Sequence, residues 1–450
     1  MELSKDNVVL ENLELTIKQL GYKLKDPDIV ETIVMEDISK FDIEDIEYYH
    51  SWSGYDLGNG LSGICCFIAE LDEIYPDEGW DIIGHNYLLK IKEKMESSGV
   101  SSLSLWGGFT GICFAALALS KGETRYQNFI NQLHQIILEK IPIETERCRN
   151  KIELGVEMTD YDVIGGLAGI GRYLLYYQNN KDMNELLKDV LRYLIKLTEK
   201  KEVNGVKVPG WYIPSENQFL PIEKVKFPNG NFNVGFAHGI SGCLALLSIA
   251  KLKGYVLKDQ DKAISTLANW LSFWSQTDEF GPLWPRRISW EEYFSNKADS
   301  KATVYEAWCY GEAGIARSLW LAGRSLKNLK WMNLASNTFN GMYKRNIRNY
   351  TLISPTYCHG IAGTLHSVQL MLKDQPTKNL LIYKNFLLNK LLKHIDLDTS
   401  FGIKDIEEIK GKKYKFNKPG LLNGSAGVAM VLLRELNKKD IEWDSVFLVK

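Results

Sequence analysis

Seven short glycine motifs, spread along most of the chain, constrain its fold more than any other feature of the sequence. Each motif has the form Gly-x-x-Gly and is followed by a run of small or apolar residues. The first glycines are Gly60, Gly108, Gly166, Gly239, Gly311, Gly360 and Gly424. Successive first glycines lie 48 to 73 residues apart, so each interval has room for two helices and their connections. Such a repeat indicates that neighbouring units stack around a shared core.

Two apolar patterns between the glycines predict two layers of helices. The run GISGCLALLSIA, residues 239–250, is apolar nearly all round, which is typical of a helix buried on most of its surface. The stretch RYQNFINQLHQIILEKI, residues 125–141, carries apolar residues at three- and four-residue spacing with charges opposite. We therefore predict one all-α domain over residues 1–450. Its expected architecture is an α/α toroid of seven helical hairpins, with an inner and an outer ring of seven helices each. The irregular segments 207–233 and 278–290 are expected to wall a ligand groove.

Composition excludes several classes of function. The 54 Lys+Arg nearly balance the 56 Asp+Glu, so no basic field exists to attract nucleic acid, and no nucleic-acid partner is expected. The start, MELSKDNVVLENLEL, lacks the basic segment and apolar run of a secretory signal. No stretch approaches the ~18 apolar residues of a membrane span. We expect a cytosolic protein.

The seven cysteines divide by their sequence context. An odd number scattered over 450 residues suits reduced thiols better than a disulfide framework. Cysteines within apolar runs are predicted to be buried core thiols; they are Cys65, Cys66, Cys113 and Cys243. Cys148, in ERCRN, is predicted to lie at the surface. Cys309 and Cys358 remain to be explained.

Three successive repeats place chemically active residues in the same position. If the inner helices run in one direction, the residues just before each first glycine converge at one rim of the ring. These residues include Cys309 and Tyr310 in CYG, Cys358 and His359 in CHG, and His238 in AHG. A lone buried Cys or His is more often structural, but two cysteines at the same position of their repeats favour a functional site.

The residue types at this rim predict a zinc ion. Two thiolates and an imidazole select zinc, and three protein ligands leave a fourth position open, as in catalytic zinc sites. Cys309 and Cys358 are 49 residues apart, so this site requires the folded ring. Either His238 or His359 could supply the third ligand. We favour His359 because Cys358 holds its backbone near the metal, and we expect one zinc ion per chain.

Several segments resemble the lanthionine synthetase C-like family, the lanthipeptide cyclases. They are AWCYGEAGIA (307–316), YCHGIAG (357–363), AHGISG (237–242) and YDVIGGLAGI (161–170), and the glycine repeats extend the resemblance over nearly the whole chain. The resemblance implies a toroid of seven inner and seven outer helices. It also implies one zinc ion held by Cys309, Cys358 and His359, in agreement with the ligands favoured above.

The resemblance further implies a stand-alone cyclase that closes thioether rings. A peptide cysteine would add to a dehydroalanine or dehydrobutyrine of a dehydrated precursor that carries a leader peptide. The expected partners are a separate dehydratase and a membrane transporter, and a complex with the transporter would hold the protein at the membrane. His238 is the implied acid/base residue, Asp162 the carboxylate that holds or tunes it, and Tyr310 a group that hydrogen-bonds the enolate or orients the ring. From the residues alone, Asp162 is equally well a helix cap and Tyr310 a rim residue with a solvated hydroxyl.

One position departs from the family pattern. Members often carry an arginine four residues before the first zinc cysteine, where this chain has Tyr305. Arg286 and Arg287 are candidates for the vacant role by sequence proximity only. The missing arginine favours an alternative, a non-cyclising protein that binds zinc and thiol peptides or glutathione, whereas His238 with Asp162 favours catalysis.

Other helical toroids fit the sequence less well. Glycosidases of this architecture need two catalytic carboxylates across the groove, whereas the repeat phase here supplies Cys and His. Prenyltransferases bind zinc through a mixed carboxylate, Cys and His set, and lack the paired CYG and CHG segments.

Overall fold

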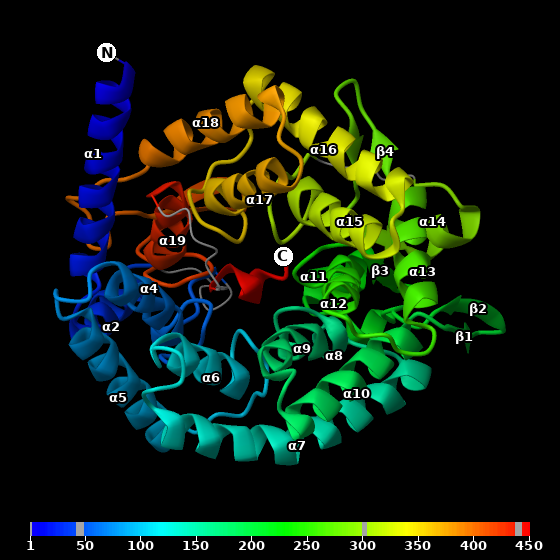
Figure 1. The fold of residues 1–450 in the computed structure, drawn as a ribbon. Helices are drawn as coiled ribbons and strands as arrows, with labels where there is room; N and C mark the ends of the chain where they lie inside the picture. The colour runs from blue at the N-terminus through cyan, green and yellow to red at the C-terminus, as the bar shows by residue number, and fades with distance from the viewer. Residues whose placement is uncertain (1, 42–48, 299–303, 437–442) are drawn as a thin grey trace.

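The helices of the chain form two concentric rings (Figure 1). The computed structural model describes residues 2–41, 49–298, 304–436 and 443–450. An inner helix begins directly after the first glycine of each motif. The inner helices are α4 (Leu61–Ile74), α6 (Phe109–Ala118), α9 (Leu167–Leu174), α12 (Ile240–Leu252), α15 (Glu312–Leu326), α17 (Ile361–Asp374) and α19 (Ser425–Leu436). Each packs against the next, and α19 packs against α4, so the ring closes.

The outer helices cover the inner ring. Those that follow the inner helix on which they pack are α5 (Trp80–Ser98), α7 (Gln127–Leu154), α10 (Lys181–Leu197), α13 (Gln260–Phe273), α16 (Leu329–Arg348) and α18 (Lys378–Leu392). The partner of α19 is α1 (Glu2–Lys23), from the other end of the chain. Shorter helices lie outside this pairing: α2 (Pro27–Ile38), α8 (Met158–Tyr161), α11 (Pro221–Lys226) and α14 (Trp290–Ser295). The prediction of an α/α toroid is confirmed.

Burial follows the two patterns of the sequence. Every residue of α12 from Ile240 to Ala250 is buried, whereas α10 buries one face and exposes the other. The four cysteines predicted in the core are buried, but so is Cys148, whose predicted surface position was wrong. Cys148 lies on α7 in line with buried residues three and four positions away, and this helical spacing outweighs its charged sequence neighbours.

Glycine is required where an inner helix meets the segment that precedes it. A β-carbon on Gly363 would lie 2.0 Å from the backbone oxygen of Tyr357. Gly311 has φ of +101°, and its β-carbon would lie 1.3 Å from the backbone oxygen of Tyr305. The close approach of backbone to backbone at these positions excludes any side chain.

Four two-stranded antiparallel sheets, which the sequence did not predict, occur in the described part of the chain. They pair β1 (Lys200–Val203) with β2 (Val206–Pro209), β3 (Asn231–Asn233) with β6 (Arg287–Ser289), β4 (Gln276–Thr277) with β5 (Pro282–Leu283), and β7 (Asp405–Ile409) with β8 (Lys412–Phe416). Two sheets matter for the site. In the β3–β6 pair Asn233 lies opposite Arg287, and in the β7–β8 pair Asp405 lies opposite Phe416. The segments 207–233 and 278–290 are therefore partly regular.

The C-terminal segment lies near the axis of the ring (Figure 1). Residues 443–449, which begin with the 3₁₀ turn Trp443–Phe447, are buried. The indole Nε1 of Trp308 donates to the backbone oxygen of Phe447 at 3.1 Å, and Nε of Arg317 donates to that of Val449 at 2.6 Å. These bonds tie the segment to the inner ring. Among the helices of the described residues, none combines the length and apolar composition that crossing a bilayer would need.

Candidate active site

Backbone hydrogen bonds join the segments that enter successive inner helices. The N–H of Ala237 donates to the carbonyl of Cys309 (3.0 Å), that of Cys309 to Cys358 (3.0 Å), and that of Cys358 to Leu422 (2.9 Å). The N–H of Leu422 then donates to the carbonyl of Gly58 at 2.7 Å. All five residues lie two positions before the first glycine of their motif. Residues at the same position of successive repeats are therefore hydrogen-bonded to one another along this rim.

The two predicted thiol ligands are in contact at this rim. The thiol of Cys358 is hydrogen-bonded to that of Cys309, which is buried. This hydrogen bond lowers the pKa of Cys309 against the effect of burial, and the nearby rings of His359 and His238 lower it further. The hydrogen bond, together with burial, raises the pKa of Cys358. One thiol of the pair is thus prepared to ionise.

The third predicted ligand, His359, is held by the β7–β8 hairpin. Its Nε2 lies 2.9 Å from Oδ1 of Asp405 and 3.3 Å from Oε1 of Glu407. Both carboxylates come from β7, and the ammonium of Lys418 lies 2.6 Å from the other oxygen of Asp405. Although burial lowers it, the pKa of His359 is raised to about 9 by the charge and hydrogen bond of Asp405, with a smaller contribution from Glu407. Burial opposes ionisation of Asp405, but Lys418 and His359 hold its pKa well below the usual range.

The structure groups His359 with carboxylates and the two cysteines with each other. Among the described residues, His359, Asp405 and Glu407 form a group whose ligand atoms all lie within 4.8 Å of one another, and this group contains no thiol. The ammonium of Lys418 already neutralises Asp405, so this carboxylate is committed to an ion pair. With Nε2 engaged by Asp405, the ring nitrogen left for a metal ion is Nδ1 of His359. That nitrogen and two thiols are a ligand set that suits zinc, and a carboxylate on the opposite ring nitrogen is the usual partner of a zinc-binding histidine.

His238 lies in hydrogen-bond contact with Asp162. Its Nδ1 lies 2.6 Å from Oδ2 of the fully buried Asp162, which leaves Nε2 for exchange of a proton. The other oxygen, Oδ1, accepts from the backbone N–H groups of Gly165 (2.7 Å) and Gly166 (2.8 Å), at the start of α9. The two oxygens of Asp162 therefore have separate partners, one on His238 and one on the backbone at the start of α9, and this geometry is compatible with both interpretations of Asp162.

Tyr310 lies beside His238, with 6.2 Å between the ring centres. Its hydroxyl accepts from Nδ2 of Asn233 at 3.2 Å and from a guanidinium nitrogen of Arg287 at 2.8 Å. Burial raises the pKa of Tyr310, against the lowering effect of Arg287 and Asn233. Protein side chains therefore hold the Tyr310 hydroxyl, whereas a purely structural tyrosine at the rim would leave its hydroxyl in solvent.

The two candidate arginines contact different tyrosines. The guanidinium of the exposed Arg286 lies 4.0 Å from the ring centre of Tyr305, the residue at the vacant position. Burial raises the pKa of Tyr305, and the Cys309 and Cys358 thiols raise it further. Arg287 reaches Tyr310 instead. Both cations therefore lie close to the rim that carries the predicted site.

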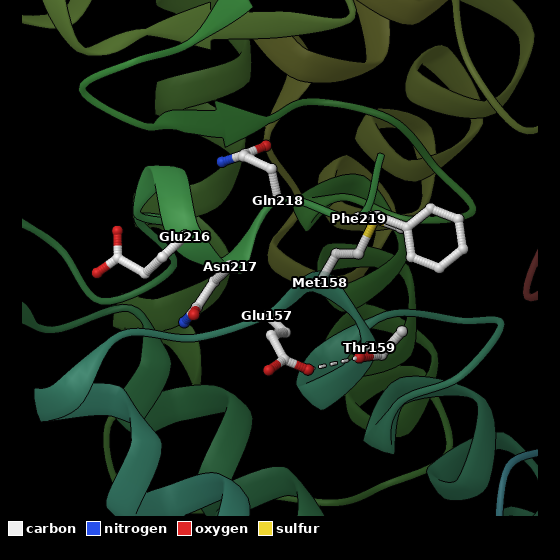
Figure 2. A pocket seen from close by; sticks show the side chains of 7 residues that line it. All are labelled: Glu157, Met158, Thr159, Glu216, Asn217, Gln218 and Phe219. Carbon is white, nitrogen blue, oxygen red and sulfur yellow. Dashed lines mark hydrogen bonds between the residues drawn. The ribbon is translucent and has the colours of Figure 1, made fainter. Parts of the chain in front are cut away.

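Figure 2 shows a surface pocket of about 220 Å³ whose lining is connected to this rim through Asn233. Residues 157–159 line one side and residues 216–219 the other. Met158 of this pocket touches Nδ2 of Asn233 through its sulfur at 3.9 Å, and Asn233 in turn donates to Tyr310. Met158 and Asn233 therefore link the pocket to Tyr310.

The sequence motifs did not indicate four residues that contact the predicted site residues or their partners: Asp405, Glu407, Lys418 and Asn233. The Lys-Gly turn between DIEEI and KKYKF is typical of a hairpin, and the two-residue period of a strand puts Asp405 and Glu407 on one face. That signal could have predicted the pair, although not its contact with His359.

Comparison with known proteins gives concordant matches. The model of the family described as "Lanthionine synthetase C-like protein" matches residues 51–448. The nisin biosynthesis protein NisC of Lactococcus lactis subsp. lactis is 28% identical over 386 residues, which are 84% of this chain and 84% of NisC. A solved structure of nisin cyclase superposes with a TM-score of 0.75 at 25% sequence identity, covering 93% of this chain and 97% of that one.

Proposed function

The chain belongs to the lanthionine synthetase C-like family and is a lanthionine-forming cyclase, and we propose that it closes thioether rings by a zinc-dependent Michael addition. The substrate is a dehydrated precursor peptide with a leader, whose cysteine thiols add to dehydroalanine or dehydrobutyrine residues. The convergence of a thiol pair, a histidine–carboxylate pair and a held phenol at one rim carries this proposal.

The zinc ligands are Cys309, Cys358 and Nδ1 of His359. Contact between the two thiols and the engagement of Nε2 by Asp405 support this assignment. When bound, zinc supplies a Lewis acid that holds the substrate thiol and favours its thiolate form. Asp405, neutralised by Lys418, keeps the imidazole oriented and its Nε2 protonated.

The remaining residues serve the proton and the charge of the addition. The substrate thiolate forms a carbon–sulfur bond to the β-carbon, and the π electrons of the dehydro residue move to give an enolate. His238 delivers a proton from Nε2 to the α-carbon, while Asp162 accepts the Nδ1–H bond and stabilises the charged imidazole. Tyr310 lies next to His238, where its hydroxyl can bind the enolate oxygen.

Partners follow from the substrate. A precursor with dehydro residues requires a dehydratase that acts first, and we propose that this is a separate protein. We also propose a complex with a membrane transporter for the modified peptide. The cytosolic location stays a prediction.

Ring closure can be measured directly. The zinc-loaded protein is incubated with several dehydrated precursor peptides, including that of nisin, and free thiols are counted by alkylation and mass spectrometry. Each closed ring removes one alkylatable thiol without changing the mass of the unalkylated peptide. Thiol counts equal to those of a protein-free control would contradict the proposal, and zinc-dependent peptide binding without thiol loss would establish the binding-only alternative.

A further inference from the structure

Two side chains from opposite strands donate to a single phenol oxygen. Asn233 ends β3 and Arg287 begins β6, and they are direct partners in the register of this two-stranded sheet. The amide of Asn233 lies 3.2 Å from the hydroxyl oxygen of Tyr310, and the guanidinium of Arg287 lies 2.8 Å from it. The sheet thus joins residues 54 positions apart in the sequence around one acceptor.

Arg287 is held firmly in this place. Its side chain is 11% exposed, and its second terminal nitrogen forms an ion pair of 2.9 Å with Glu223 of α11. Its Nε is buried and has no hydrogen-bond partner among the described residues. The guanidinium therefore bridges α11 and Tyr310, and Asn233 is fixed by its other end, where Oδ1 accepts from the N–H of Gly235 at 3.0 Å.

These contacts decide what the Tyr310 hydroxyl can do. A hydroxyl offers two acceptor sites and one donor. Asn233 and Arg287 have no acceptor atoms directed at it, so both acceptor sites are used and the O–H is left to donate elsewhere. A charged donor also polarises the hydroxyl and strengthens the hydrogen bond that it donates.

We propose that Arg287, fixed opposite Asn233, is a positioning residue of the ring-closing reaction that makes Tyr310 a hydrogen-bond donor to the enolate oxygen. This inference rests on the proposed function. The enolate oxygen accepts the Tyr310 hydrogen bond without proton transfer, and the proton for the α-carbon still comes from His238. The cation thus acts on the developing charge through the phenol.

The test compares three single variants with the wild type in steady-state ring closure. Arg287→Met should lower kcat by about 10²-fold with little change in KM, because Tyr310 is then no longer held as a donor to the developing oxyanion. Arg287→Lys should recover part of the rate because it keeps the charge but not the fork geometry. Arg348→Met, which removes an exposed arginine on α16, serves as the matched control and should leave kcat unchanged. Thermal unfolding and zinc content are measured for each variant.

Coupling to Tyr310 is the deciding measurement. In the Tyr310→Phe background, Arg287→Met should cost less than about 3-fold, since the shared route is already lost. An equal cost of Arg287→Met in both backgrounds would overturn the inference and leave the proposed function intact.

A second readout needs no turnover. With 3-fluorotyrosine at position 310, the ¹⁹F resonance should shift in Arg287→Met and stay in place in Arg348→Met. An unmoved resonance in Arg287→Met would overturn the contact. A wild-type protein that closes no ring overturns the proposed function instead, and the resonance still decides whether Arg287 holds Tyr310.

Discussion

The backbone N–H of Cys309 donates to the backbone carbonyl of Cys358 over 3.0 Å, although the two residues are 49 positions apart. The bond holds their side chains in the same phase of neighbouring repeats, and the thiols are in contact. Because the bond uses only backbone atoms, this register survives removal of either thiol.

Removal of one thiol should therefore abolish metal binding without unfolding the ring. We expect about one zinc per chain in the wild type and a near-complete loss in Cys309→Ala and in Cys358→Ala. Elemental analysis after dialysis measures the zinc, and thermal unfolding tests the fold. The control is Cys243→Ala, which removes a buried thiol from α12 and should bind zinc as the wild type does. Full zinc content in either rim variant would refute the ligand assignment.

Loss of the Asp405 carboxylate should weaken zinc binding while the three ligands remain. Asp405→Ala frees Nε2 of His359 and leaves the buried ammonium of Lys418 without its 2.6 Å partner. We expect zinc affinity to fall by about 10- to 100-fold, as measured by competition with a chromophoric chelator. Glu408→Gln, on the exposed side of the same strand, is the control and should bind zinc as the wild type does. Unchanged affinity in Asp405→Ala would show that this carboxylate does not orient His359.

The two oxygens of Asp162 can be separated by substitution. Asn at position 162 can still accept from Gly165 and Gly166, but it presents an amide N–H to Nδ1 of His238 and favours the wrong tautomer. Asp162→Asn should lose roughly 10²-fold or more in kcat with a nearly unchanged melting temperature. Asp162→Ala should lose activity and also about 1–2 kcal/mol of stability, because the two N–H groups lose their acceptor. Equal stability losses in both variants would argue against the division of roles.

A methyl group at Gly311 should be incompatible with the fold. Its β-carbon would meet the Tyr305 carbonyl at 1.3 Å, and its φ of +101° lies in a region nearly restricted to glycine. We expect Gly311→Ala to lose more than the ~1–3 kcal/mol of backbone strain alone, measured by denaturant unfolding. Gly122 also has a positive φ, of +65°, but open space surrounds it. Gly122→Ala therefore introduces backbone strain without a steric clash and should lose less stability.

The buried His366 should make stability depend on pH. Burial lowers its pKa to about 4 from the ordinary value of 6.5, against the hydrogen bond with Asp444. Below pH 6.5 the unfolded chain binds a proton at His366 that the folded chain does not. The stability that neutral, buried His366 contributes is therefore fully present above pH 6.5. This stability is lost as the pH falls toward 4, by up to about 1.4 kcal/mol per pH unit.

Comparison with His366→Gln isolates this contribution. The difference in unfolding free energy between wild type and variant should shrink from pH 7 to pH 4.5 in denaturant titrations. A constant difference across this range would show that His366 does not titrate as its burial requires.

The sequence determined the repeat and, with it, the parts of the site that obey the repeat. Gly-x-x-Gly recurs because backbone meets backbone where each inner helix begins, and this requirement is local to each unit. Since every unit enters the ring in the same way, the positions of Cys309, Cys358, His238 and Tyr310 at one rim could be predicted from their distance to a glycine.

Only the tertiary structure decided which partners these residues have. Asp405 reaches His359 from a hairpin outside the repeat, and Lys418, just after that hairpin, pairs with Asp405. Arg287 reaches Tyr310 because β6 pairs with β3 in a register that puts it opposite Asn233. Pairing between distant strands depends on which edges meet after the ring has closed. The position of a residue within its repeat cannot predict this pairing, because each such contact occurs once and breaks the symmetry of the units.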